Sequence, residues 1–296
     1  MNTDYYKTEG FISREHLKST DNDVPTVKYV DEFNGGDILK IACTQTALSS
    51  YQQKKLVDSW CEFLPTCEAS DIRFYSRVNQ KLFDAACKAI NLNSLFIKWA
   101  SNGISTYDSL NKARGITRLY LGSVTQVDDL TAISSLSNLE WLEIHEHKIL
   151  RDLSPLSNLK NLIGIRMSGG LFGTQKINSL KPLTRLTKLR RLYLSNLVAL
   201  DGDLSPLTNL YQLEYLDLAN RYSTEELIKL AISIPDCDHG INAFRDKHIK
   251  CQKCDKGFVL EVMDKRKKFL CTVCDENKCQ KIKKRYQNKY RECLKK

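Results

Sequence analysis

Four cysteines near the C-terminus have the spacing of a metal site. Two residues separate Cys251 from Cys254 and Cys271 from Cys274, and sixteen residues lie between the two pairs. Each Cys-x-x-Cys pair can turn two thiolates to one side, and the intervening chain can bring the pairs together around a tetrahedral ion. The spacing therefore predicts one zinc ion. Because four protein ligands leave no open coordination position, this zinc would be structural and not catalytic.

The elements that must position these cysteines can be read from the flanking sequence. Residues 257–263 and residues 266–270 flank Asp264-Lys265, and this arrangement predicts a hairpin. With the two cysteine pairs, this insert resembles a zinc ribbon. After it, apolar residues recur every three or four positions, which predicts an amphipathic helix; they are Cys279, Ile282, Tyr286, Tyr290 and Cys293.

The positive charge of the chain is concentrated in this same region. Residues 245–296 hold 18 of the 45 Lys and Arg but 7 of the 35 Asp and Glu, a net charge of +11, so residues 1–244 carry −1. A hypothesis of nucleic-acid contact therefore belongs to the C-terminal region. The candidate contacts are Lys281, Lys283, Lys284 and Arg285. Docking of a protein, or a face that only adds solubility, explains the same charge.

The rest of the chain is dominated by a repeat. A pattern of the form Leu-x-x-Leu-x-Leu occurs six times, and successive copies are 24, 23, 23, 27 and 24 residues apart. Its copies start at Leu92, Ile116, Leu139, Leu162, Leu189 and Leu213. A second pattern follows it, as in Leu153-Ser-Pro-Leu156 and Leu204-Ser-Pro-Leu207. A period of about 20–29 residues is typical of leucine-rich repeats, in which each unit supplies one strand.

These repeats resemble those of internalin-like and phosphatase-regulator-like leucine-rich-repeat proteins. The resemblance implies an α/β solenoid of parallel strands with helical or 3-10 returns over residues 66–236. Residues 1–65 would hold an N-terminal capping helix near Thr46–Leu64, and residues 245–296 the zinc-ribbon-like module with its basic helix. One departure is clear: the position that family usually fills with Asn after each strand holds Val124, His147, Gly170, Leu197 and Arg221.

The strands also predict a binding surface. Residues that alternate with the buried leucines point to the opposite, concave face of a solenoid. There we expect an exposed column rich in Tyr, Arg and Phe, a composition typical of interface hot spots. The candidate partner-binding residues are Arg73, Phe96, Tyr120, Trp141, Glu143, Arg166, Tyr193, Tyr215 and Asp217. Exposed strand faces also favour Tyr, Arg and Phe for their β-propensity alone, which is the alternative explanation. His145 and His147 are interpreted as ordinary surface histidines.

The sequence favours an interaction protein over an enzyme. It contains no Gly-rich phosphate loop, no nucleophile elbow and no His-Glu-x-x-His pattern. No apolar run approaches the ~20 residues of a membrane span, and the N-terminus does not resemble a secretory signal. With eleven cysteines expected to stay reduced, we predict a cytoplasmic protein. Its solenoid would bind an unknown protein, in the manner of an inhibitor or an immunity-like protein. The alternatives are a nucleic-acid-associated adaptor and a bacterial effector.

Overall fold

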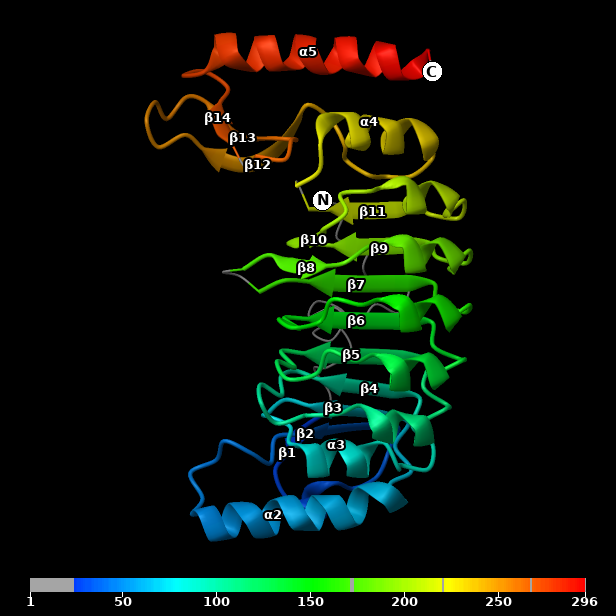
Figure 1. The fold of residues 1–296 in the computed structure, drawn as a ribbon. Helices are drawn as coiled ribbons and strands as arrows, with labels where there is room; N and C mark the ends of the chain where they lie inside the picture. Colours follow the sequence, from blue (N-terminus) through cyan, green and yellow to red (C-terminus); the bar gives the residue numbers. More distant parts are fainter. Residues whose placement is uncertain (1–23, 171–172, 220, 267, 296) are drawn as a thin grey trace.

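The structure, a computed structural model, describes residues 24–170, 173–219, 221–266 and 268–295. Its main element is a parallel sheet of nine strands that stack along the length of the molecule (Figure 1). In spatial order they are β1 (Thr26–Val27), β2 (Ile38–Ile41), β3 (Asp71–Phe74), β4 (Ser94–Ile97), β5 (Arg118–Gly122), β6 (Trp141–His145), β7 (Gly164–Ser168), β9 (Arg191–Leu194) and β11 (Tyr215–Leu218). The last six are the strands of the six repeat copies, and β3 is the strand predicted at Ile72, one repeat period before Leu95.

Six of these strands, β3 to β7 and β9, are each followed by a return on the other side of the solenoid before the next strand of the sheet. The α-helix α3 (Gln80–Ala86) forms one return. Five others are 3-10 helices: η4 (Asp108–Lys112), η5 (Thr131–Ser135), η6 (Ser154–Asn158), η7 (Lys181–Arg185) and η8 (Ser205–Asn209). The Pro of each Leu-x-Pro-Leu pattern lies in the first turn of η6, η7 and η8, where its missing N–H costs no hydrogen bond.

The repeated leucines fill one continuous core between the sheet and the returns. Leu142, Leu192 and Leu156 have no exposed surface, as the repeat predicts. The sequence predicts a helical return over residues 79–90 with Ile90 facing inward. This prediction is wrong at Ile90, which lies beyond the end of α3 and is 65% exposed.

The first strands extend the sheet beyond the predicted repeat. The alternating residues Thr26–Val30 predict a strand, but β1 covers only Thr26–Val27, and β2 was not predicted. β2 pairs in parallel with β3, but α2 and its connections separate the two in sequence and break the 23–27-residue period. A small second sheet, β8 (Gln175–Ile177) with β10 (Leu197–Ala199), was also missed; β8 lies within the longest spacing between repeats.

Helices cover both ends of the solenoid (Figure 1). The helix α2 (Ser50–Phe63) lies at the N-terminal end, as predicted, and begins where the Ser49 side chain accepts a hydrogen bond from the N–H of Gln52. The short 3-10 helices η2 (Val30–Glu32) and η3 (Leu64–Thr66) flank it. At the other end lies α4 (Thr224–Ser233). The first 23 residues of the predicted N-terminal segment lie outside the described residues.

The C-terminal module follows α4. It has an antiparallel sheet of β12 (Phe244–Lys250), β13 (Phe258–Val262) and β14 (Phe269–Cys271), and then α5 (Glu276–Leu294). The predicted hairpin and helix are confirmed, whereas β12 was missed. Among the described residues, no helix combines the length and the apolar character needed to cross a membrane.

The turn positions that usually carry Asn are filled differently here. Val124 and Leu197 are fully buried, and His147 is 1% exposed. The Nδ1–H of His147 donates to the carbonyl oxygen of His145 at 3.2 Å, which leaves Nε2 to accept a hydrogen bond from the hydroxyl of Tyr107. The interpretation of His147 as a surface residue is therefore wrong. Burial lowers the pKa of His147 to about 4.

This buried histidine should make the stability of the protein depend on pH. An unfolded histidine has a pKa of about 6.5, so the unfolded state gains a proton first as the pH falls. Stability is therefore complete above pH ~6.5 and is lost as the pH falls towards the folded-state pKa of about 4. Between pH ~7 and pH ~5 we expect a loss of about 2 kcal/mol through His147.

The measurement is urea unfolding at both pH values. His147→Asn should remove about 2 kcal/mol of this pH dependence, whereas His248→Asn, at a histidine whose side chain is 81% exposed, should not change it. An unchanged pH dependence in His147→Asn would show that the buried imidazole does not control stability in this range.

Candidate metal centre and concave face

The four predicted metal ligands meet at one point. Their sulfur atoms all lie within 4.8 Å of one another, with 3.7 Å between the sulfurs of Cys254 and Cys271 and 4.0 Å between those of Cys251 and Cys274. Zinc–sulfur bonds of about 2.3 Å in a tetrahedron place the sulfurs about 3.8 Å apart. The donor set and its geometry thus fit a four-coordinate metal ion.

Backbone amides support the two knuckles. The N–H groups of Lys253 and Val273 each donate to the sulfur of the first cysteine of their own pair, at 3.4 Å in both cases. The N–H of Cys274 donates to the sulfur of Cys271 at the same distance. Such amides stabilise thiolates over thiols.

The thiol pKa values follow from these contacts. The pKa of Cys251 is lowered by the backbone amide of Lys253, and the pKa of Cys254 is lowered to about 6 by the amides of Lys256 and Gly257. The pKa of Cys274 is raised to about 12 by its contact with the Cys254 thiol. Deprotonation of Cys274 is therefore favoured by a nearby cation, which fits metal binding coupled to proton release.

Gly257 allows the two knuckles to approach each other. A Cβ atom at this position would lie 2.5 Å from the sulfur of Cys271 and 2.9 Å from the hydroxyl of Thr272. The carbonyl oxygen of Gly257 also accepts a hydrogen bond from the N–H of Cys251 at 2.8 Å. Any side chain here would push the second pair of cysteines away from the first.

The module packs against the end of the solenoid. Met263 is 1% exposed and belongs to the main hydrophobic core. α5 contacts α4, and Lys289 forms a 3.1 Å ion pair with Glu225. Arg245 of β12 reaches Asp217 of β11 at 3.5 Å. The four-cysteine cluster thus belongs to a module that covers the last repeat.

The predicted column on the concave face is aligned as expected. Parallel pairing brings its members into one row across the sheet: Arg73, Phe96, Tyr120, Glu143, Arg166, Tyr193 and Asp217. The expectation that they are exposed is wrong. Arg73, Phe96, Glu143 and Tyr193 are at most 5% exposed, and Tyr120, Arg166 and Asp217 are half-buried.

Neighbouring side chains along the column cover one another. The rings of Phe96 and Tyr120 lie 4.4 Å apart, and the guanidinium of Arg166 lies over the Tyr193 ring at 5.7 Å. Trp141 is 5% exposed and forms a small cluster with Tyr193 and the half-buried Tyr215. These aromatic residues therefore stabilise the concave face as well as offering contacts.

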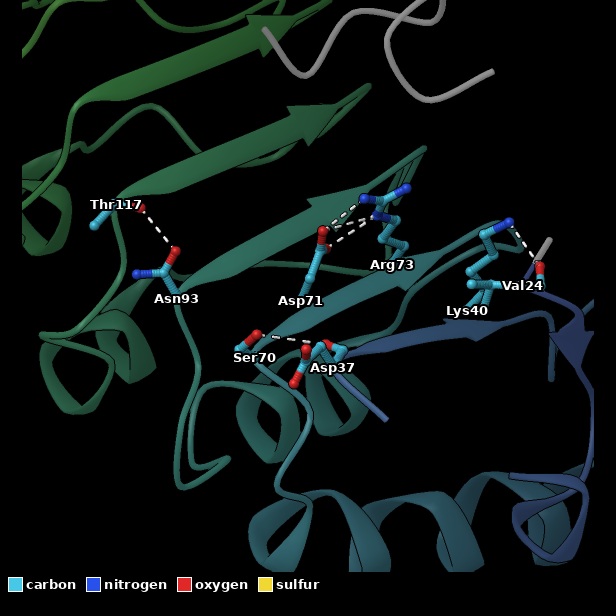
Figure 2. A network of polar contacts seen from close by, with 8 residues as sticks. All are labelled: Val24, Asp37, Lys40, Ser70, Asp71, Arg73, Asn93 and Thr117. Carbon is cyan, nitrogen blue, oxygen red and sulfur yellow. Dashed lines mark hydrogen bonds and ion pairs between the residues drawn. The ribbon is translucent and has the colours of Figure 1, made fainter. Parts of the chain in front are cut away.

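Charged members at the two ends of the column are already engaged. Arg73 binds the carboxylate of Asp71 on its own strand at 2.6 Å, and the ammonium of Lys40 donates to the Val24 carbonyl oxygen at 2.7 Å (Figure 2). At the other end, Asp217 accepts a hydrogen bond from Ser195 at 2.6 Å in addition to its contact with Arg245. These contacts hold the charged side chains at the two ends of the column in place.

The middle of the concave face contains a hollow of about 650 Å³. Three predicted residues line it: Tyr120, Glu143 and Arg166. Sequence reasoning missed most of the rest of the wall, including Trp99, Ser123, Glu146 and Asn196 at the carboxyl ends of the strands. We refer to this space as the concave hollow.

A ladder of left-handed residues forms the rim of the concave hollow. Ser123, Glu146 and Asn196 have φ values of 49°, 56° and 57°. Non-glycine residues adopt this conformation only where the surrounding structure requires it. A sequence signal exists only at Asn196, because Asn tolerates a left-handed conformation better than Ser or Glu.

Glu143 is the most unusual group in the concave hollow. Its Oε2 atom contacts Nε2 of His145 at 3.2 Å, and Nδ1 of His145 contacts the hydroxyl of Ser168 at 2.5 Å. Its Oε1 atom is buried and has no hydrogen-bond partner in the described part of the chain. Burial raises the pKa of Glu143, although His145 opposes this shift.

The predicted basic contacts lie on α5, away from the concave hollow. Lys281, Lys283, Lys284 and Arg285 are all exposed. The predicted apolar stripe of this helix is half-buried along its whole length.

This architecture is a leucine-rich-repeat solenoid, as the resemblance implied. The internalin InlF from Listeria monocytogenes superposes with a TM-score of 0.51 and 19% sequence identity, over 68% of this chain and 52% of that chain. Internalin C2 from the same organism gives a TM-score of 0.44 and 24% identity, over 62% and 71%. A leucine-rich-repeat protein from Leptospira interrogans gives 0.41 and 14%, over 69% and 60%.

These similarities describe the fold and nothing finer. All three identities are below 25%, and this chain spans about half the length of InlF. No protein-family model and no curated protein matches the sequence. The function must therefore be argued from the sites.

Proposed function

We propose that this chain is a non-catalytic protein that binds a partner protein in the concave hollow. The metal centre is proposed to hold one structural zinc ion that stabilises the C-terminal end of the solenoid. The solenoid fold supports this role, because stacked repeats present an extended concave surface suited to another protein.

The single observation that carries the proposal is the buried, unpartnered Oε1 atom of Glu143. A buried acceptor without a hydrogen bond costs about 1–3 kcal/mol. A hydrogen-bond donor from a partner would remove this cost. The aromatic rings of Tyr120 and Trp99, together with Arg166, line the same hollow and supply the residue types that dominate binding energy at interfaces.

The row Ser168–His145–Glu143 has the order of a hydrolytic triad, but its surroundings support a structural role. A serine nucleophile needs backbone N–H groups that face the developing oxyanion. The N–H of Gly169, directly after Ser168, instead donates to the carbonyl oxygen of Ser195 at 3.2 Å. The row fixes the His145 ring between two strands.

The test begins with affinity purification of the native partner, followed by binding measurements with variants. Tyr120→Ala and Arg166→Ala should each weaken binding by more than ~1 kcal/mol, or about fivefold, because each would remove an anchor from the interface. Glu143→Gln, which removes the charge at nearly constant shape, should weaken binding by a similar amount.

Tyr211→Ala is the matched control. Tyr211 is 84% exposed and does not line the concave hollow, so its loss should leave both binding and stability unchanged. Unaltered affinity in Tyr120→Ala and Arg166→Ala, with both variants folded, would place the partner elsewhere on the molecule.

A further inference from the structure

A second hollow lies in the C-terminal module and shares no residue with the concave hollow. It has a volume of about 700 Å³ and runs between the β13–β14 hairpin, the start of α4 and one face of α5. Cationic side chains dominate its lining: Arg266, Lys268, Lys278, Lys281, Arg285 and Lys289, against the carboxylates of Glu225 and Asp264. We refer to it as the basic groove.

Four of these cations are not balanced within the module. Lys278 is paired with Asp275 at 2.7 Å, and Lys289 with Glu225 at 3.1 Å. Arg266, Lys268, Lys281 and Arg285 are exposed, and the described residues offer none of them an ion pair. The first two belong to the hairpin and the last two to α5, so uncompensated positive charge faces the groove from both walls.

The floor of the basic groove is apolar and partly aromatic. Val262 and Met263 are buried beneath it, and Ile282 and the half-buried Tyr286 contribute from α5. The Tyr286 ring lies 6.4 Å from that of Tyr290, at an interplanar angle of 28°. An occupant would therefore meet cations at the sides and a ring and aliphatic groups at the bottom.

We propose that the basic groove binds single-stranded nucleic acid. Phosphates would be neutralised by the four unpaired cations, and an unstacked base could pack on Tyr286, the combination by which proteins hold single strands without reading sequence. An acidic peptide would use the cations, but its carboxylates would gain nothing from the ring. A duplex keeps its base faces stacked inside, so it could not use the floor either.

The structure divides the basic residues that the sequence grouped together. Lys281 and Arg285 line the basic groove, whereas Lys283 and Lys284 lie outside its lining on the same helix. The chain therefore supplies a matched control: two double variants that remove the same charge from the same helix but on different faces.

The experiment uses the 296-residue chain purified with zinc and a labelled oligonucleotide of about 12 nucleotides without base-pairing potential. Affinity is measured by fluorescence anisotropy from about 50 to about 300 mM salt. The double variant Lys281→Gln/Arg285→Gln should weaken binding about tenfold at ~0.1 M salt. It should also reduce the magnitude of the slope of log K against log salt by about 1.4, because each lost phosphate contact accounts for about 0.7. Lys283→Gln/Lys284→Gln should change affinity less than about twofold.

Further measurements test whether the loss of binding comes from the basic groove itself. Circular dichroism and metal content must be unchanged in both double variants, and a third variant on the other wall, Arg266→Gln/Lys268→Gln, should repeat the tenfold loss. Equal losses in the groove pair and the control pair would show diffuse attraction and overturn the groove. Tighter binding of a matched duplex or of a glutamate-rich peptide, or no binding of the single strand, would also overturn the proposal.

Discussion

Removal of the metal is expected to unfold residues 245–296 while the solenoid stays folded. The module has a small sheet and a helix in which no residue is fully buried, so it has little hydrophobic core of its own. Structural zinc sites can contribute about 10–16 kcal/mol of apparent binding free energy to such modules. The stacked repeats, in contrast, share a continuous core from Val27 to Ile241. A chelator should therefore make the module sensitive to protease and leave a resistant fragment that ends near Pro235.

Metal analysis and cysteine variants make this prediction specific. Protein purified without added zinc should contain about one equivalent. Cys254→Ser and Cys271→Ser should lose the metal and become protease-sensitive in the module. Cys293→Ser, which alters a half-buried thiol outside the four-cysteine cluster, should behave like the wild type. Less than about a tenth of an equivalent of metal, with four titratable thiols, would contradict the site.

The module contacts the solenoid, so the two parts are not expected to unfold entirely independently. Met263 belongs to the core, and Arg245 reaches Asp217 on the last strand. Loss of the metal should therefore loosen α4 and β11 more than the strands at the other end. Cooperative unfolding of the whole chain with the module would show that the last repeat depends on this cover.

The fold could be predicted from the sequence because its information is local and repeated. Buried leucines such as Leu142 and Leu192 recur at one period. An error in assigning one repeat would therefore conflict with the regular spacing of the others. The four-cysteine cluster was predictable for the same kind of reason, because each Cys-x-x-Cys pair defines its own knuckle. Where an element stands outside the period, as β2 and β12 do, the prediction failed.

The state of the concave face could not be predicted in this way. The alternation of side chains along a strand shows which face of the sheet a residue lies on, but not which other side chains cover it. Strands in a parallel sheet lie about 4.8 Å apart, so large side chains in one row, such as Phe96 and Tyr120, pack on each other. Burial of His147 has a similar origin, since its partner Tyr107 comes from 40 residues earlier in the chain. Both outcomes depend on contacts between repeats, which a pattern within one repeat does not contain.

Replacement of Gly122 by alanine is expected to destabilise the solenoid more than any exposed substitution. Gly122 ends β5 and lines the concave hollow. A Cβ atom there would lie 2.0 Å from the backbone oxygen of Lys98 and 2.8 Å from that of Ile97. Backbone atoms of a paired strand cannot rotate away as a side chain can, so β4 and β5 would have to separate. We expect a loss of at least about 3 kcal/mol in the free energy of unfolding.

Gly115→Ala is the control for this effect, because it adds the same methyl group in the same repeat. Its Cβ atom would lie 3.2 Å from the backbone oxygen of Leu92, a contact that a shift of a few tenths of an ångström relieves. Urea unfolding followed by circular dichroism should show a much lower midpoint for Gly122→Ala and a change below ~1 kcal/mol for Gly115→Ala. Equal stabilities would mean that β4 and β5 are not held as close as the sheet register requires. Because Gly122 lines the concave hollow, a folded Gly122→Ala protein should also bind the partner less tightly, which links the packing of the repeats directly to the proposed binding surface.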